Sequence, residues 1–91
     1  MDPPTLEELR NEIDSINKKL VLLLARRMSV TQQIATLKKK DQKPVHDPKR
    51  EEDILLKVSS DAKDYGLDEA FIKRIFTEIM EYTKVRESEV R

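Results

Sequence analysis

The sequence predicts an all-α protein, a single domain of three helices over residues 1–91, and three observations support this prediction. Charged residues make up 40% of the chain and aromatic residues 4%, Trp and Cys are absent, and Gly occurs once. This composition is typical of long helices rather than of sheets. Apolar residues recur at steps of three and four, the period of a helix that packs along its length. Prolines and the glycine stand where helices are expected to begin and end.

The first helix is predicted over about residues 6–41. Thr5 and Glu8 form a capping box, with two prolines just before it. An apolar seam follows, and nothing breaks its pattern before the turn sequence at residues 41–44. Nine of the ten seam positions are aliphatic. In order, the seam consists of Leu6, Leu9, Ile13, Ile16, Leu20, Leu23, Arg27, Val30, Ile34 and Leu37.

The length of this helix predicts a second copy of the chain. About 35 residues at 1.5 Å each span roughly 50 Å. A compact domain of this size has a radius of gyration of only about 12 Å. A lone chain would leave much of the seam exposed to water, so we expect a homodimer.

Two shorter helices are predicted over about residues 48–65 and 69–88. Asp47 and Pro48 supply an N-cap and a first-turn proline, and Gly66 ends the first of these helices. Asp68 is placed to cap the next helix. The apolar faces consist of Ile54, Leu55, Val58 and Ala62 on one helix, and of Ile72, Ile75, Phe76, Ile79 and Met80 on the other.

Composition also argues against several functions. Eighteen basic and eighteen acidic residues cancel, so no global field recruits nucleic acid or an anionic membrane. Without cysteine there is no disulfide or thiolate metal site, and His46, the sole histidine, has no partner at metal-binding spacing. No apolar run approaches the roughly 20 residues of a membrane span. We expect a cytoplasmic protein that binds no metal, nucleic acid or membrane.

Arg27 is the first candidate functional residue, because it is the one charged position in the seam. A guanidinium does not lose its proton, and a buried cation costs several kcal/mol unless an anion meets it. Either a protein carboxylate pairs with Arg27, or its site accepts an anionic ligand. A seam cation can also simply fix register or oligomeric state.

Other polar residues share a face with Arg27 or can reach it. Lys38 lies eleven residues later, about three whole turns, so the two side chains lie on the same face of the helix. Arg10 lies roughly 26 Å away along the axis and cannot share a pocket with Arg27 of its own chain. An antiparallel dimer would bring Arg10 of one chain beside Arg27 of the other. Thr83 and Glu87 are four residues apart, on one face of the third helix.

With Arg50 and Glu51 nearby at the start of the second helix, these cations suit a small dianion that also carries a hydroxyl. Each residue also has a plain structural interpretation. A lysine triplet at a helix C-terminus meets the dipole favourably, Glu87 can be a solvated residue, and Thr83 can be a polar filler. The set, rather than any one residue, carries the functional hypothesis.

Taken in order, the set resembles the small all-helical chorismate mutases, from about Leu6 to Glu87. The most specific piece is Pro-Val-x-Asp-x-x-Arg-Glu at residues 44–51. The resemblance implies an intertwined dimer of three-helix chains, whose long first helices span both protomers. The other matching residues are Leu9-Arg10, Leu24-Ala25-Arg26-Arg27, Lys38, Gly66-Leu67-Asp68, Thr83 and Glu87.

Members of this family convert chorismate to prephenate, a Claisen rearrangement on the route to phenylalanine and tyrosine, without metal, cofactor or covalent intermediate. The resemblance implies catalytic roles for Arg27, Lys38 and Glu87. It implies that Lys38 stabilises the negative charge that develops on the ether oxygen of the substrate. The implied substrate-binding residues are Arg10 of the partner subunit, Arg27, Lys38, Asp47, Arg50, Glu51, Thr83 and Glu87.

Within that set, the resemblance implies that Arg27 and the partner's Arg10 hold the two carboxylates. Glu51, with the backbone amide near Asp47, takes the ring hydroxyl. Arg50 adds positive charge, and Thr83 adds a hydroxyl contact. Clamping both carboxylates favours the folded conformer that can react.

Glu87 departs from the commonest family pattern, which has a glutamine as the second donor to the ether oxygen. An ionised carboxylate accepts rather than donates, so only protonated Glu87 can play that role. The sequence therefore predicts that activity falls as pH rises.

Two other functions are compatible with the sequence. The same scaffold supports elimination of pyruvate from isochorismate, although the segment at residues 44–51 favours the mutase. A non-catalytic helical dimer, such as an adaptor or a regulatory module, is the alternative from another class.

Overall fold

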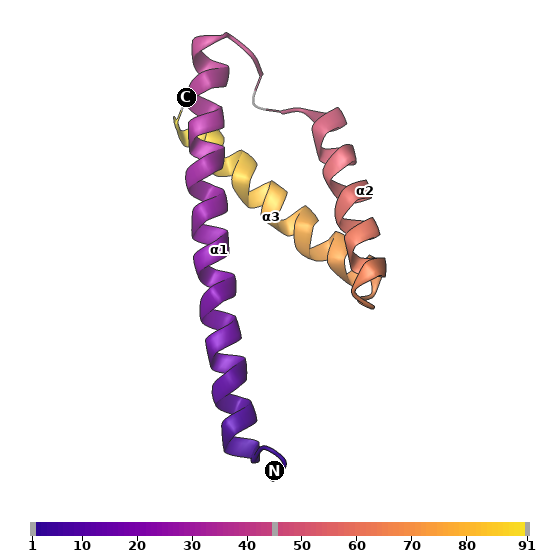
Figure 1. The fold of residues 1–91 in the computed structure, drawn as a ribbon. Coiled ribbons are helices and arrows are strands. Elements are labelled where there is room, and N and C mark those ends of the chain that lie inside the picture. The colour runs from indigo at the N-terminus through magenta and orange to yellow at the C-terminus, as the bar shows by residue number, and fades with distance from the viewer. Residues whose placement is uncertain (1, 45, 91) are drawn as a thin grey trace. The chain divides into compact units, whose positions relative to one another are not determined.

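The computed structural model describes residues 2–44 and 46–90, with the side chain of residue 90 left out. It contains three helices, α1 (Leu6–Lys40), α2 (Pro48–Asp64) and α3 (Glu69–Val90), and the described residues form no strand (Figure 1). The predicted all-α class is confirmed. The helix ends lie one or two residues from the predicted positions 41, 65 and 88. No helix of the described residues is long and apolar enough to cross a membrane.

The chain divides into two units, residues 1–30 and residues 31–91, and the first contains most of α1. Its start has the predicted capping box. The Thr5 Oγ1 atom accepts the backbone N–H of Glu8 at 3.1 Å, and the Thr5 N–H donates to Glu8 Oε2 at 3.3 Å. Ten large aliphatic side chains of this unit are between 43% and 65% exposed. These aliphatic side chains are therefore about half exposed rather than buried in an apolar core.

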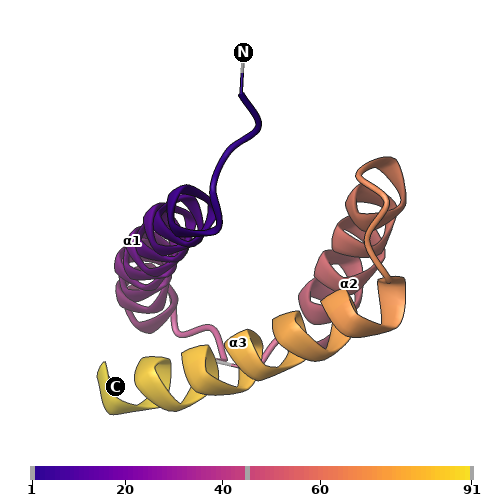
Figure 2. The same cartoon turned by 90° about the horizontal axis from the view of Figure 1, so that it is seen from below.

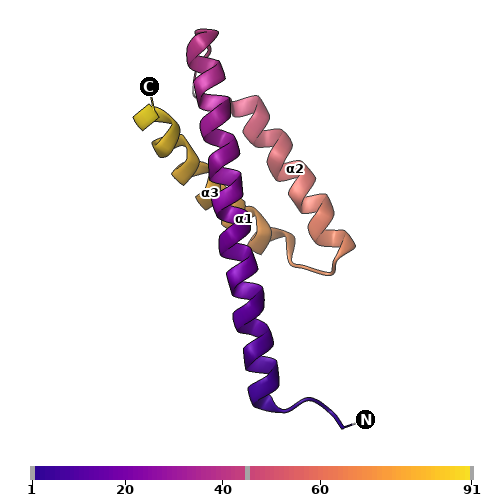
Figure 3. The same ribbon diagram turned by 60° about the vertical axis from the view of Figure 1, so that its left-hand side comes forward.

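The second unit contains the last turns of α1 and the hairpin formed by α2 and α3 (Figures 2 and 3). Both hairpin helices begin at the aspartates that the sequence predicts as caps. Asp47 Oδ1 accepts the N–H of Arg50 at 3.1 Å, and Asp68 Oδ2 accepts the N–H of Phe71 at 2.9 Å. Each carboxylate satisfies a backbone donor that has no partner within its helix.

Gly66 ends α2 in the left-handed conformation, with φ +70°. Its N–H donates to the Lys63 carbonyl at 3.2 Å, and the Leu67 N–H donates to the Ala62 carbonyl at 2.8 Å. This pair of bonds is a Schellman motif. Because glycine has no Cβ, it adopts this conformation at little steric cost.

The end of α1 has the same hydrogen-bond pattern around a residue that is not glycine. Gln42 has φ 58°, its N–H donates to the Lys39 carbonyl at 3.2 Å, and the Lys43 N–H donates to the Lys38 carbonyl at 2.7 Å. A left-handed conformation costs a residue with a Cβ roughly 1 kcal/mol. This turn places Lys38 in the last turn of α1, just before the loop to α2.

The core of the second unit is small and partly polar. Ser59 Oγ donates to the Leu55 carbonyl at 2.7 Å, so this buried hydroxyl is satisfied within its own helix. Most of the predicted apolar face of α2 and α3 is half-buried or buried, but Ile75 is 37% exposed. Among the described residues, Glu87 is the one ionisable residue that is buried. The buried residues are Ala35, Ser59, Ala62, Met80, Thr83 and Glu87.

We predict that Gln42→Gly stabilises the protein by about 0.5–1 kcal/mol, because glycine removes the steric cost of the positive φ. Chemical denaturation measures the change in the free energy of unfolding. The matched control is Lys57→Gly at an exposed position within α2, which we expect to cost about 1 kcal/mol. A loss of stability in Gln42→Gly equal to that of the control would contradict this account of the turn.

Candidate active site

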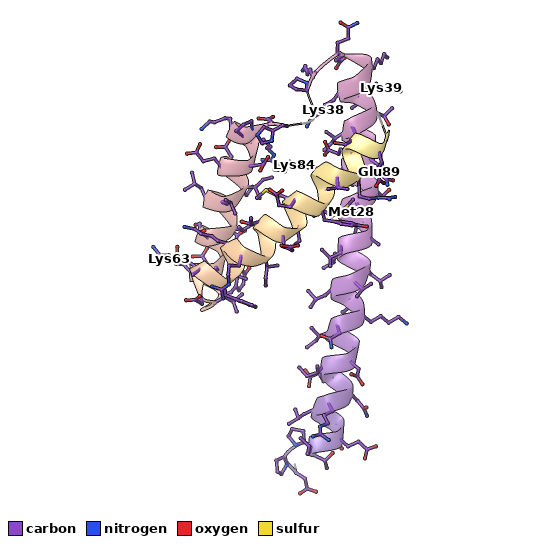
Figure 4. The ribbon with its side chains drawn as sticks, turned by 180° about the vertical axis from the view of Figure 1, so that it is seen from behind. Met28, Lys38, Lys39, Lys63, Lys84 and Glu89 are labelled. Carbon is purple, nitrogen blue, oxygen red and sulfur yellow. The ribbon has the colours of Figure 1, made fainter. Side chains whose placement is uncertain are left out.

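Lys38 and Glu87 form a contact between the end of α1 and the end of α3. The Lys38 Nζ atom lies 3.7 Å from Glu87 Oε2, and the two side chains are 20% and 8% exposed. The distance is an ion-pair distance but exceeds the range of a hydrogen bond. Lys38 and its neighbour Lys39 leave α1 in different directions (Figure 4).

The Glu87 carboxylate is incompletely satisfied. Its Oε2 atom is buried and has no hydrogen-bond partner among the described residues. Nearly all buried polar atoms of folded proteins have such a partner, and exceptions occur at catalytic positions or where a water or ion completes the site. A buried acceptor beside an ammonium group therefore marks a candidate site for a small polar ligand.

Thr83 lies one turn before Glu87 on the same face of α3 and is 7% exposed. Its hydroxyl donates to the Ile79 carbonyl at 2.8 Å. A hydroxyl has one proton to donate, so in this rotamer Thr83 cannot also donate to a ligand. Thr83 thus lies on the same face of α3 as Glu87, and its predicted contact with a ligand stays a prediction.

Glu51, in the first turn of α2, is the centre of a second polar cluster. Its Oε1 atom accepts a hydrogen bond from Lys84 Nζ at 3.4 Å, and its Oε2 atom lies 3.3 Å from His46 Nδ1. Lys84 Nζ is also 2.9 Å from Glu81 Oε1. Glu51 Oε2 is buried and, like Glu87 Oε2, has no hydrogen-bond partner among the residues described.

The acidic neighbours of Lys84 keep it charged. The hydrogen bond to Glu81 raises the pKa of the Lys84 ammonium above its ordinary 10.5; partial desolvation opposes this, and Glu51 adds to the increase. A raised pKa in the folded state stabilises the fold below pH 10.5, and this contribution is lost as pH rises through the raised value. The Lys84 ammonium therefore lies between the carboxyl groups of Glu51 and Glu81.

Lys84 was not predicted from the sequence, and His46 was considered there only as a metal ligand without a partner. Lys84 and Glu51 are 33 residues apart and come from different helices. No local spacing rule connects such a pair. The i,i+3 spacing of Glu81 and Lys84 was the one available signal, and it is common on exposed helix faces.

The remaining predicted residues lie at the start of α2 and in the first unit. Asp47 is exposed and caps α2, and the Arg50 side chain is exposed beside it. In the first unit, Arg10 is exposed, whereas Arg27 is half-buried and has an interaction partner. The structure therefore shows a contact between Lys38 and Glu87, with Thr83 one turn before Glu87 on α3. The roles of all the predicted site residues in substrate binding and catalysis stay predictions.

Comparisons with known proteins identify relatives over most of the chain. The family described as chorismate mutase type II matches residues 9–88. The chorismate mutase of Methanocaldococcus jannaschii is 33% identical over 79 residues, which cover 87% of this chain and 80% of the relative. The bifunctional chorismate mutase/prephenate dehydratase of Escherichia coli K12 is 34% identical over 73 residues, 80% of this chain and 19% of the relative.

A similar bifunctional protein from Buchnera aphidicola subsp. Schizaphis graminum is 37% identical over 76 residues, which cover 84% of this chain. This chain spans about a fifth of the length of each of these two bifunctional relatives, but most of the M. jannaschii protein. The family match and the M. jannaschii relative confirm the resemblance seen in the sequence. This chain belongs to the type II chorismate mutase family.

Proposed function

We propose that this chain is a chorismate mutase, an isomerase of aromatic amino acid biosynthesis, with Lys38 and Glu87 at its reaction centre. The family match and the names of its relatives support the activity. The observation that supports the location is the Lys38–Glu87 contact, in which a buried carboxylate oxygen has no hydrogen bond from the described residues.

Positioning accounts for much of the expected catalysis. Conversion of chorismate to prephenate breaks one carbon–oxygen bond and forms one carbon–carbon bond within the same molecule, so no proton or electron has to be supplied. Arg27 and Arg10 of the partner subunit hold the two carboxylates, and Arg50 adds positive charge. This clamp selects the folded conformer, which lowers the entropic part of the barrier.

Lys38 acts where charge develops. As the carbon–oxygen bond breaks, the ether oxygen becomes more negative, and an ammonium donor aimed at it stabilises the transition state more than the ground state. Glu87 lies 3.7 Å from the Lys38 ammonium. Only the ionised form of Glu87 compensates the charge of Lys38. When protonated, Glu87 is the second donor to the ether oxygen.

Glu51 takes the ring hydroxyl of the substrate. Its Oε2 atom is a buried acceptor with no hydrogen bond among the described residues, which is what a hydroxyl donor requires. The backbone near Asp47, at the N-terminus of α2, contributes to the same contact. Glu51 therefore distinguishes chorismate from a dicarboxylate without a hydroxyl.

The working protein is a homodimer. The exposed aliphatic side chains of residues 6–30 form an apolar face far larger than scattered surface residues provide. A helix with no tertiary packing is only marginally stable in water. A second copy covers this face and brings its own Arg10 to the site. A cytoplasmic location stays a prediction.

We predict that Lys38→Ala lowers the kcat for chorismate about 10²–10³-fold, because it removes a donor to the developing oxyanion. Direct measurement of chorismate consumption and prephenate formation tests this. Lys39→Ala is the matched control, since Lys39 is the exposed neighbour in the same turn, and it should keep wild-type activity.

A wild-type protein without prephenate formation would refute the proposed function. Assaying isochorismate in parallel distinguishes the pyruvate-eliminating alternative on this scaffold. Equal losses in Lys38→Ala and Lys39→Ala would refute the special role of Lys38.

Mixing two inactive variants tests the contribution of Arg10 across the dimer. Arg10→Ala and Arg27→Ala should each lose activity as homodimers. In a mixed dimer, one site combines the intact Arg27 of one chain with the intact Arg10 of the other. Unfolding and refolding the two variants together should therefore restore about a quarter of wild-type activity, since half the dimers are mixed and each has one intact site. No recovery, with mixed dimers shown to form, would place both arginines in the site from one chain.

Glu87→Gln tests the donor role of Glu87. In the wild type, kcat/KM should fall as pH rises, because ionised Glu87 accepts rather than donates. Glutamine donates at every pH, so the variant should lose this alkaline decline. Glu89→Gln, two residues away and paired with Arg86, should keep the wild-type profile. An alkaline decline of the same size in Glu87→Gln would remove Glu87 from the mechanism.

A further inference from the structure

The Glu51 carboxylate is held asymmetrically by its neighbours. Its Oε1 atom accepts the hydrogen bond from Lys84 at 3.4 Å, whereas its Oε2 atom is buried and has no such bond from the described residues. Leaving a buried acceptor without a hydrogen bond is costly. The carboxylate is therefore oriented so that Oε2, rather than Oε1, is the atom that can accept a hydrogen bond from a ligand.

Lys84 is well placed to impose this orientation. It extends from α3 toward α2 (Figure 4), and its side chain and that of Glu51 are 26% and 24% exposed. Its shorter contact, 2.9 Å, is with Glu81, which is 59% exposed and lies one turn earlier on α3. Glu81 thus anchors the ammonium at the outer edge of the cluster while the same ammonium reaches inward to Glu51.

His46 is the other neighbour of Glu51, but it is less suited to hold the carboxylate. The His46 Nδ1 atom lies 3.3 Å from Glu51 Oε2, yet Glu51 Oε2 makes no hydrogen bond with the described residues. The imidazole is 61% exposed and comes from the loop before α2. Lys84 lies on a helix and contacts both Glu51 and Glu81, whereas His46 lies in a loop and is exposed. Lys84 therefore restrains the Glu51 carboxylate more than His46 does.

We propose that Lys84 is a positioning residue that holds Glu51 Oε1 and so aims Oε2 at the ring hydroxyl of chorismate. This role rests on the proposed function, in which Glu51 accepts that hydroxyl. Lys84 touches neither the substrate nor the reacting atoms. It acts on substrate affinity, because the hydroxyl contact is present in both the bound substrate and the transition state.

Lys84→Met is the first test, because methionine keeps the length of the side chain and removes the ammonium. The KM for chorismate should rise about five- to tenfold, the effect of losing one charge-assisted contact, while kcat changes less than about threefold. Lys84→Arg should restore most of the affinity. Lys49→Met is the matched control, because Lys49 pairs with Asp53 on α2 away from Glu51 and should leave KM unchanged.

A double-mutant cycle separates positioning from a general structural role. If Lys84 acts through Glu51, then adding Lys84→Met to Glu51→Gln should raise KM less than about twofold further. A fully additive effect, or a wild-type KM in Lys84→Met with its helical content intact, overturns the proposal. If the wild type does not convert chorismate, the proposed function fails as well. Turnover by the wild type with an unchanged KM in Lys84→Met refutes the Lys84 proposal alone.

Discussion

The contact between Lys38 and Glu87 is the interaction on which the account of this protein depends. There the Lys38 ammonium approaches the Glu87 carboxyl group, and the Glu87 side chain is only 8% exposed. A fully formed salt bridge would satisfy both groups. At 3.7 Å the pair instead keeps its charge compensation while Glu87 Oε2 lacks a hydrogen bond from the described residues. Such an arrangement stabilises the fold less than it could. In the reaction that we propose, the Lys38 ammonium donates to an oxygen atom that becomes more negative, and Glu87 can do the same only when it is protonated.

Helix caps and helix-terminal turns position the residues of this candidate site. The turn at Gln42 ends α1 directly after Lys38, at the expense of a positive φ in a residue with a side chain. The cap at Asp47 begins α2 so that Glu51 lies in its first turn, and Gly66 reverses the chain into α3, which carries Thr83 and Glu87. Each polar group of the site is thus within a few residues of a helix end or on one face of one helix. The reaction that we propose requires charged side chains in fixed positions rather than a conformational change.

The features that could be predicted from the sequence are those that depend on neighbouring residues. The Thr5–Glu8 capping box, the aspartate caps and the glycine turn all rest on interactions within three to five residues, and all occur in the structure. The Lys84–Glu51 contact joins residues 33 apart and has no periodic signal, so it could not be predicted. The predicted approach of Arg10 to Arg27 of another chain rests on the length of the first helix and on the family resemblance.

A crystal structure with a stable dicarboxylate that mimics the cyclic transition state of the rearrangement tests the central claim most directly. We predict that the ether oxygen of this molecule lies within hydrogen-bond distance of Lys38 Nζ, with the Glu87 carboxyl group also close to it. Its two carboxylates should contact Arg27 and Arg10 of the partner subunit. A structure in which Lys38 and Glu87 instead bond directly to each other, with the ligand bound elsewhere, would contradict the account.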